Sequence, residues 1–296
     1  MLPNFLVVGA AKSGTSSIDR YLGQHPDVYM PPKKEAHYFS KASFPDRFTG
    51  PGDDGMNMET IGSLDRYESL FDDVCDQKAI GESSAFYLYY PETAERIAAV
   101  NPEMKIVIVL RNPVERAFSA YMYLMRDERE TLSFEAGLAA EEERRRQNFE
   151  PMWLYRELGL YAEQVRRYLD VFGPNQVKVI LYDEFARDNA GIMADLFSFL
   201  GVRTDFPIDT SIRYNESGKP KSRALFNFVA KPNLLKEMVK PFVPLAVRER
   251  LGNRAKSMIL ERVDMDFSTR AELKAFYSQD IRSLQTLLGR DLSRWL

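Results

Sequence analysis

The chain has 296 residues, of which 45% are hydrophobic and 28% are charged. This composition is typical of a globular protein with one or two domains, and it excludes a disordered, collagen-like or disulfide-stapled chain. Forty basic and 43 acidic residues leave a net charge of −3, which argues against a nucleic acid as partner. With one cysteine, Cys75, and two histidines, His25 and His37, the sequence offers neither an internal disulfide nor a thiolate-rich or histidine-rich metal site.

The sequence shows no membrane-spanning or targeting segment. Its most apolar run, Ile106–Leu110, is far shorter than the roughly 20 residues that cross a bilayer. The first residues lack the basic region, apolar region and cleavage site of a signal peptide. We therefore expect a cytoplasmic protein, and the sequence leaves its oligomeric state open.

Hydrophobic patterning predicts strands that alternate with helices. The first strand is expected at residues 4–9 and a helix at 15–22, followed by a long loop over 28–51. Further strands are expected at 79–82, 105–110 and 177–181. Further helices are expected from residue 91 and over 113–125, 141–146, 161–172 and 190–200. The helix over 141–146 is expected to be a solvated charged face. This order predicts an α/β fold with a central parallel sheet flanked by helices. We expect one domain over 1–296, with an α/β core at 1–205 and a basic turn and helical part at 206–296.

The segment Gly9-Ala-Ala-Lys-Ser-Gly14 lies between the first predicted strand and helix, where backbone N–H groups and the helix dipole favour an anion. Its two glycines have the spacing of a nucleoside-triphosphate loop, but Thr15 occupies the position of the loop lysine, and the lysine is at position 12. The next two buried strands are followed by Glu82-Ser-Ser and Arg111-Asn-Pro rather than by a magnesium-binding aspartate. The loop therefore suits a phosphate-bearing ligand without the usual metal, unless the glycines serve only a tight turn.

A second anion site is predicted at the end of the third strand. Arg111 follows that strand directly, at the sheet edge where open α/β proteins bind ligands, and its guanidinium can pair with a phosphate. Ser119, on the helix that follows, could help Arg111 hold the phosphate. Two anion sites at two strand ends of one sheet predict a single ligand with two separated phosphates.

These stretches resemble the sulfotransferases that use 3′-phosphoadenosine 5′-phosphosulfate (PAPS), particularly the heparan-sulfate-type branch, with its N- and 3-O-sulfotransferases, and its bacterial relatives. Residues 8–17 resemble the family's 5′-phosphosulfate loop, 110–121 its 3′-phosphate motif, and 32–39 the segment that carries the catalytic glutamate. Residues 81–84 and 159–163 and the basic turn 215–223 also look similar to family segments. The resemblance implies a P-loop-like sulfotransferase fold with a helical C-terminal cap.

The resemblance also implies the ligands. PAPS would be the donor and adenosine 3′,5′-bisphosphate the product, with no metal involved. The acceptor would offer a hydroxyl, or an amine, on a small molecule, a lipid-linked intermediate or a saccharide. The residues expected to bind the donor are Ala11, Lys12, Ser13, Gly14, Thr15, Ser16, Ser17, Arg111, Ser119, Lys219, Lys221, Ser222 and Arg223.

Three residues are candidates for catalysis. Lys12 is placed to stabilise the negative charge that develops on the oxygen between phosphorus and sulfur. The resemblance gives Glu35 the role of the base that removes the acceptor proton, although a glutamate after two lysines is also typical of a surface ion pair. His37 could orient Glu35 or the acceptor, or be a structural imidazole, and we expect His25 to be structural.

Two alternative functions remain open. A loop-containing nucleotide kinase or nucleoside triphosphatase would turn over ATP with magnesium, and Thr15 in place of the loop lysine argues against it. A catalytically inactive nucleotide-binding protein would bind adenosine 3′,5′-bisphosphate and transfer nothing.

Overall fold

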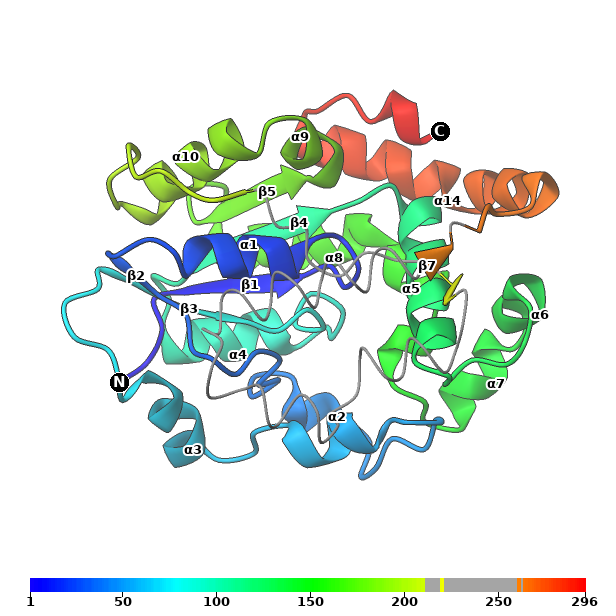
Figure 1. The fold of residues 1–296 in the computed structure, drawn as a ribbon, viewed down its shortest axis with the longest axis horizontal. Coiled ribbons are helices and arrows are strands. Elements are labelled where there is room, and N and C mark those ends of the chain that lie inside the picture. The colour runs from blue at the N-terminus through cyan, green and yellow to red at the C-terminus, as the bar shows by residue number, and fades with distance from the viewer. Residues whose placement is uncertain (211–218, 221–259, 262) are drawn as a thin grey trace.

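The computed structural model describes residues 1–210, 219–220, 260–261 and 263–296 (Figure 1). Its centre is a five-stranded sheet in the order β2–β3–β1–β4–β5, and every neighbouring pair of strands is parallel. The strands of this sheet are β1 (Phe5–Gly9), β2 (Val28–Tyr29), β3 (Ala79–Ser83), β4 (Lys105–Leu110) and β5 (Val177–Leu181). A separate antiparallel pair consists of β6 (Lys219–Pro220) and β7 (Leu260–Glu261).

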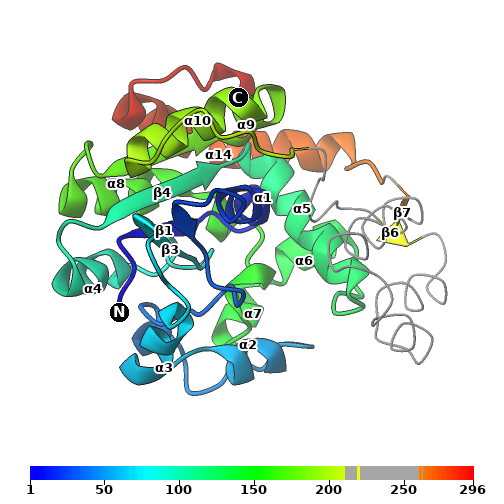
Figure 2. The same cartoon turned by 60° about the vertical axis from the view of Figure 1, so that its left-hand side comes forward.

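Helices cover both faces of the sheet (Figures 1 and 2). One face packs against α1 (Thr15–Leu22), α9 (Tyr182–Arg187) and α10 (Asn189–Leu200). The opposite face packs against α4 (Thr93–Val100), α5 (Pro113–Arg126), α8 (Tyr161–Phe172) and α14 (Phe267–Leu288). The shorter helices are α2 (Asp54–Glu59), α3 (Leu64–Glu68), α6 (Phe134–Ala139) and α7 (Glu141–Arg146), and the 3₁₀ turns are η1 (Lys41–Ser43), η2 (Ser69–Phe71), η3 (Pro151–Trp153), η4 (Glu157–Gly159) and η6 (Ser293–Trp295).

The central strands are apolar on both sides because helices cover both faces. In β1, Phe5 and Val7 belong to the core that α1 and α10 complete, whereas Leu6 and Val8 belong to the core on the other side. All four side chains are fully buried. A strand buried on both faces is therefore a continuous hydrophobic run, which is the pattern that the sequence shows.

The predicted α/β fold with a parallel sheet is confirmed, and the strands expected from the sequence are present. The prediction of a loop over 28–51 was wrong at its start, because Val28 and Tyr29 form β2, an edge strand paired with Ala79 and Ile80 of β3. Two residues are too few to show an alternating pattern. The helices α2, α3, α6 and α9 were not predicted, since five or six residues give little helical periodicity.

The strand order determines where the candidate site forms. Because β1 lies between β3 and β4 and all three are parallel, the segments that follow them meet at one edge of the sheet. Backbone hydrogen bonds continue past the strand ends. The N–H of Ala10 donates to Val109 O at 2.8 Å, and the N–H of Ser84 donates to Val7 O at 3.1 Å. The glycine loop, the Glu82-Ser-Ser segment and Arg111 are thereby held side by side.

Candidate active site

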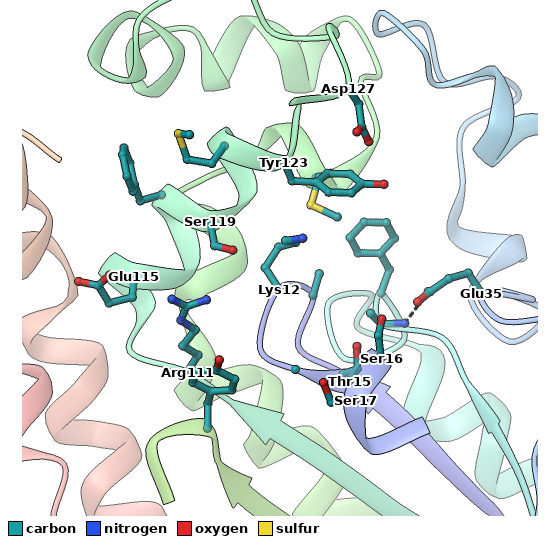
Figure 3. Close-up of a pocket in the computed structure, with 18 of the residues that line it drawn as sticks. Lys12, Thr15, Ser16, Ser17, Glu35, Arg111, Glu115, Ser119, Tyr123 and Asp127 are labelled. Atoms are coloured by element: carbon teal, nitrogen blue, oxygen red, sulfur yellow. Dashed lines mark hydrogen bonds between the residues drawn. The ribbon is translucent and has the colours of Figure 1, made fainter. Parts of the chain in front are cut away.

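A cavity of about 1180 Å³ opens at this edge of the sheet. Figure 3 shows that its walls come from the loop after β1, the strand end before α5, α5 itself and the segment that carries Glu35. Pockets for single small ligands usually measure roughly 300–1,000 Å³. The cavity is therefore large enough for two reactants.

The loop after β1 is shaped by its glycines. Gly14 is the N-cap of α1 with φ 100°, and a Cβ there would lie 3.0 Å from the Tyr182 ring. A Cβ at Gly9 would lie 2.8 Å from both Ala85 O and Leu88 Cβ. Among the residues described, no side chain caps the N-terminus of α1. Within the described part of the chain, the N–H groups of Thr15 and Ser16 have no acceptor, whereas that of Ser17 donates to Gly14 O at 3.0 Å. Unpaired N–H groups at a helix start are what an anion site requires.

Lys12 extends from this loop into the cavity. Its backbone is left-handed, with φ 67°, and its Nζ lies 4.1 Å from the centre of the Tyr123 ring on α5. Burial lowers the pKa of Lys12 to about 7; Arg126, Arg111 and Arg116 act in the same direction, and Asp127 opposes them. A negatively charged ligand beside Nζ would restore the protonated form.

Arg111 reaches the cavity because a helix begins immediately after it. Asn112 is the N-cap of α5, where its Oδ1 accepts from Val114 N at 3.0 Å, and Pro113 occupies the first helical position. The chain therefore turns sharply at the end of β4. Figure 3 shows the Arg111 guanidinium directed toward Ser119, which lies one helical turn beyond Glu115 on α5.

The cations that line the cavity differ in their partners. Arg129 pairs with Asp53 and with Glu150, and Arg270 pairs with Glu115. Within the described part of the chain, neither Lys12 nor Arg111 forms an ion pair with a carboxylate. The two cations predicted to bind phosphates are thus those whose charge is left for a ligand.

Glu35 lies across the cavity from Lys12 (Figure 3). Its Oε2 accepts from the backbone N–H of Ala85 at 2.8 Å, which is the dashed line in Figure 3, and its Oε1 lies 3.7 Å from Lys34 Nζ. Lys34 also donates to Ser16 Oγ at 3.2 Å and so connects the Glu35 segment to α1. The carboxylate keeps 39% of its surface exposed and is accessible to a second reactant.

His37 lies behind Glu35, with Nε2 3.4 Å from Glu35 Oε2. The ring is 3% exposed and stacks on Phe86 at 5.5 Å between ring centres. Burial lowers the pKa of His37 to about 4, with Glu35 opposing and Lys34 adding to the effect. A neutral ring with its proton on Nε2 can donate to Glu35. His25, by contrast, bonds at both nitrogens, to Arg203 O and to Asp27 N, each at 3.0 Å.

The structure brings most of the sequence candidates together. Those that line the cavity are Ala11, Lys12, Gly14, Thr15, Ser16, Ser17, Glu35, His37, Arg111 and Ser119. Ser13 is fully buried and is absent from the lining, and its N–H donates to Ala10 O at 3.2 Å. The side chain of Lys219, and Lys221, Ser222 and Arg223, lie outside the described residues.

Sequence reasoning missed the residues on the far side of the cavity, among them Tyr123, Asp127, Arg129 and Glu150. Tyr123 follows Ser119 by four positions on the same helix, and that spacing was a usable signal. The other three come from connecting segments that carry no recognisable motif. In the described ranges, no group of three or more His, Cys, Asp or Glu side chains could hold a metal ion.

The fold and site define a class of α/β proteins that bind a phosphate-bearing ligand at the N-terminus of the first helix. Residues 3–206 match the profile of the sulfotransferase family, so the chain belongs to that family. A sulfotransferase from Alicyclobacillus acidocaldarius has 51% sequence identity and a TM-score of 0.81, and the match covers 100% of this chain and 99% of that one. The predicted sulfotransferase fold is therefore confirmed. Among the residues described, no helix is long and apolar enough to span a membrane.

Curated relatives are longer than this chain. Heparan sulfate glucosamine 3-O-sulfotransferase 6 of Homo sapiens is 29% identical over 206 residues, which are 68% of this chain and 53% of the relative. The membrane-associated sulfotransferase kil1 of Dictyostelium discoideum is 34% identical over 125 residues, which are 41% of this chain and 23% of the relative. The chain thus matches about half or less of the length of these relatives.

The buried His37 predicts an acid-dependent loss of stability. Because its pKa is about 4 in the folded protein and 6.5 in the unfolded one, the unfolded chain takes up the proton first. Stability should be complete above pH 6.5 and fall by about 3 kcal/mol between pH 6.5 and 4. Urea unfolding at several pH values measures this for the wild type and for His37→Asn, which cannot titrate there. Parallel pH dependences for the two proteins would contradict the prediction.

Proposed function

We propose that the protein is a PAPS-dependent sulfotransferase, in which a sulfuryl group passes from PAPS to an acceptor hydroxyl or amine. One observation carries this proposal. Lys12 and Arg111 line the same cavity at the ends of adjacent strands with no carboxylate partner among the described residues, and a carboxylate, Glu35, stands opposite. Two cations in one cavity suit a ligand with two phosphates, and the base across from them suits an acceptor that must lose a proton.

The donor would lie between the loop after β1 and the start of α5. The N–H groups and hydroxyls of Thr15, Ser16 and Ser17 would bind its 5′-phosphate, and Arg111 with Ser119 would bind its 3′-phosphate. The uncapped N-terminus of α1 supports the first part, and the direction of Arg111 toward Ser119 supports the second. We propose the same binding role for Ala11, Ser13, Gly14 and Ser222 and for the basic residues Lys219, Lys221 and Arg223.

Lys12 and Glu35 would act on the reacting groups. The Lys12 ammonium stabilises the charge that develops on the leaving oxygen, in a cavity where one charge counts for more than in water. Glu35 takes the acceptor proton, and His37 supports it as a neutral hydrogen-bond donor. Every step uses protein side chains, and we propose that no metal takes part.

Residues 1–296 would form one domain, with a core at 1–205 and a basic turn and helical part at 206–296. The packing of α14 in the same core as α5 and α8 supports this arrangement. The single cysteine supports a cytoplasmic location, and the identity with the Alicyclobacillus acidocaldarius protein supports a bacterial origin.

The acceptor is sought with radiolabelled PAPS and a panel of alcohols, amines and saccharides, with and without EDTA. Labelled product that forms equally in EDTA supports the proposal. Magnesium-dependent turnover of ATP would identify a kinase or nucleoside triphosphatase instead. Tight binding of adenosine 3′,5′-bisphosphate without transfer to any acceptor would identify an inactive nucleotide-binding protein.

Lys12→Ala should lower turnover by about 10²–10³-fold, because one preorganised charge at the leaving oxygen is lost, while donor binding falls far less. The pKa of Lys12, about 7, adds a second expectation. At pH 8 the wild type should take up a proton as it binds adenosine 3′,5′-bisphosphate, and the variant should not. Steady-state kinetics and calorimetry in two buffers measure both effects. Lys33→Ala is the control, because the Lys33 Nζ donates to Glu59 O at 2.7 Å and Lys33 does not line the cavity.

Arg111 should make the site selective for a 3′-phosphate. Adenosine 3′,5′-bisphosphate should bind more tightly than AMP by about 1.5–3 kcal/mol, as expected for a charge-assisted contact, and Arg111→Ala should remove most of that difference. Calorimetry with both nucleotides tests this, with the exposed Arg20→Ala as control. Equal affinities of the wild type for both nucleotides would show that Arg111 binds another group.

Glu35→Gln should lower turnover by about 10²–10⁴-fold, the usual contribution of a general base, while the affinity for adenosine 3′,5′-bisphosphate is kept. His37→Ala should cost less, since the ring acts through Glu35. Kinetics of both variants with the acceptor from the screen decide the assignment. If Glu35→Gln is fully active and His37→Ala is inactive, the imidazole is the base.

A further inference from the structure

The segment that carries the proposed base has an unusual backbone. Glu35 and His37 both have left-handed conformations, with φ 58° and 53°. Residues with side chains rarely adopt this region, and here two of them lie within three positions. Such a conformation persists only where neighbouring groups hold it in place. The groups that do so therefore determine where the Glu35 carboxylate lies.

The C-terminal end of β3 supplies these groups. The N–H of Glu35 donates to Ser83 O at 2.9 Å, and the N–H of Ala85 donates to the Glu35 side chain. On the other side of Glu35, the N–H of His37 donates to the hydroxyl of Ser84 at 3.0 Å. Two of these contacts use backbone atoms that any residue would supply. The bond from His37 to Ser84 depends on a side chain, and so does the contact of the Ala36 N–H with the carboxylate of Glu82.

The direction of the Ser84 hydrogen bonds is fixed by Glu82. A hydroxyl carries one proton, and because Ser84 Oγ accepts from His37 N–H, that proton is free to bond elsewhere. It points to Glu82 Oε1, 2.5 Å away. Glu82 is fully buried on β3, and its other oxygen lies 3.5 Å from the Tyr67 hydroxyl. Burial raises the pKa of Glu82 to about 7, and the bond from Ser84 opposes that rise.

We propose that Ser84, oriented by Glu82, is a positioning residue that fixes the Glu35–His37 segment and so places the base against the acceptor. This inference rests on the proposed function, because it assigns a role in the same reaction. Neither side chain lines the cavity. Their effect is therefore on the geometry of Glu35, and a misplacement of about 1 Å at a reacting group can cost about 10²-fold in rate.

A purely structural role would have a different signature. If a buried hydrogen bond serves only stability, its loss lowers the free energy of unfolding but leaves the turnover number and the donor affinity of the folded protein unchanged. Loss of a positioning bond lowers turnover while the donor, held on the opposite wall by the β1 loop and Arg111, binds as before. The two roles are therefore separated by measuring turnover and donor affinity in the same variant.

Adjacent serines provide a matched pair of variants. Ser83 and Ser84 are both buried, but within the described part of the chain the Ser83 hydroxyl has no hydrogen-bond partner. Ser84→Ala removes the hydroxyl that accepts from the His37 N–H. Ser83→Ala removes only the Ser83 hydroxyl and keeps the backbone carbonyl that accepts from the Glu35 N–H.

Three measurements are made on each full-length variant. They are the turnover number with the acceptor found in the PAPS screen, the affinity for adenosine 3′,5′-bisphosphate by calorimetry, and hydrogen exchange at the His37 amide. Ser84→Ala should lower turnover by about 10–100-fold, keep the affinity within twofold, and speed exchange at His37 by about tenfold or more. Ser83→Ala should stay within about threefold of the wild type in turnover and exchange.

If Ser84→Ala does not fold, Ser84→Cys replaces it, because sulfur fills the space and is only a weak hydrogen-bonding group. A Ser84 variant that matches Ser83→Ala in turnover and exchange overturns the proposal. So does a Ser84 variant that loses donor affinity and turnover together, since that result places Ser84 in donor binding. If the wild-type protein binds adenosine 3′,5′-bisphosphate but transfers nothing, the proposed function is wrong. Hydrogen exchange at the His37 amide then tests the contact between His37 and Ser84 independently of turnover.

Discussion

The site depends on one constraint, namely that β1 lies between β3 and β4 with all three strands parallel. Parallel strands end at the same edge of a sheet, and each must be followed by a crossover through a helix. Three consecutive turns therefore lie side by side at the C-terminal edge, and each carries a different group. The loop after β1 provides Lys12, the end of β3 provides Ser84, and the end of β4 provides Arg111. Because β1 has β3 on one side and β4 on the other, the loop after β1 lies next to both of the other segments.

The second physical element is charge that the protein leaves unbalanced. A cation in a partly dry cavity without a carboxylate partner is unfavourable, because it loses the solvation that water provides. The pKa of Lys12 is lowered for this reason, since burial disfavours its protonated form. Arg129 and Arg270, which line the same cavity, are neutralised by Asp53, Glu150 and Glu115. The protein thus pairs Arg129 and Arg270 with its own carboxylates, whereas among the described residues Lys12 and Arg111 have no such partner. An anion with two phosphates would supply the missing negative charge when it binds, and would thereby remove the free-energy cost of the two unpaired cations.

The fold, and the meeting of the β1 loop with Arg111 and Ser119 in one cavity, could be predicted from the sequence because both depend on local patterns. The buried strands are continuous apolar runs, and Gly14 and Asn112-Pro113 mark the starts of α1 and α5 by their capping chemistry. The two-residue strand β2 could not be predicted, since its pairing with β3 is a tertiary contact without a period of its own. The same holds for the far wall. Arg129 reaches the cavity through contacts with Asp53 and Glu150, partners 76 and 21 positions away in the sequence.

The two halves of the cavity differ in what their geometry depends on. The proposed donor half is built on strand ends, and moving any of its groups would require moving the central sheet, in which β1 and β3 are buried along their whole length. The far half is built from α2, the end of α5 and the segment before η3, which connect elements rather than form the core. Substitutions there change the lining without disturbing the sheet. Glu35 stands between the halves, because its carboxylate faces the cavity while its backbone is bonded to β3. In the proposed reaction, this arrangement would keep the base fixed relative to the donor while the far half of the cavity varies, and one fold could then serve different acceptors with a single donor.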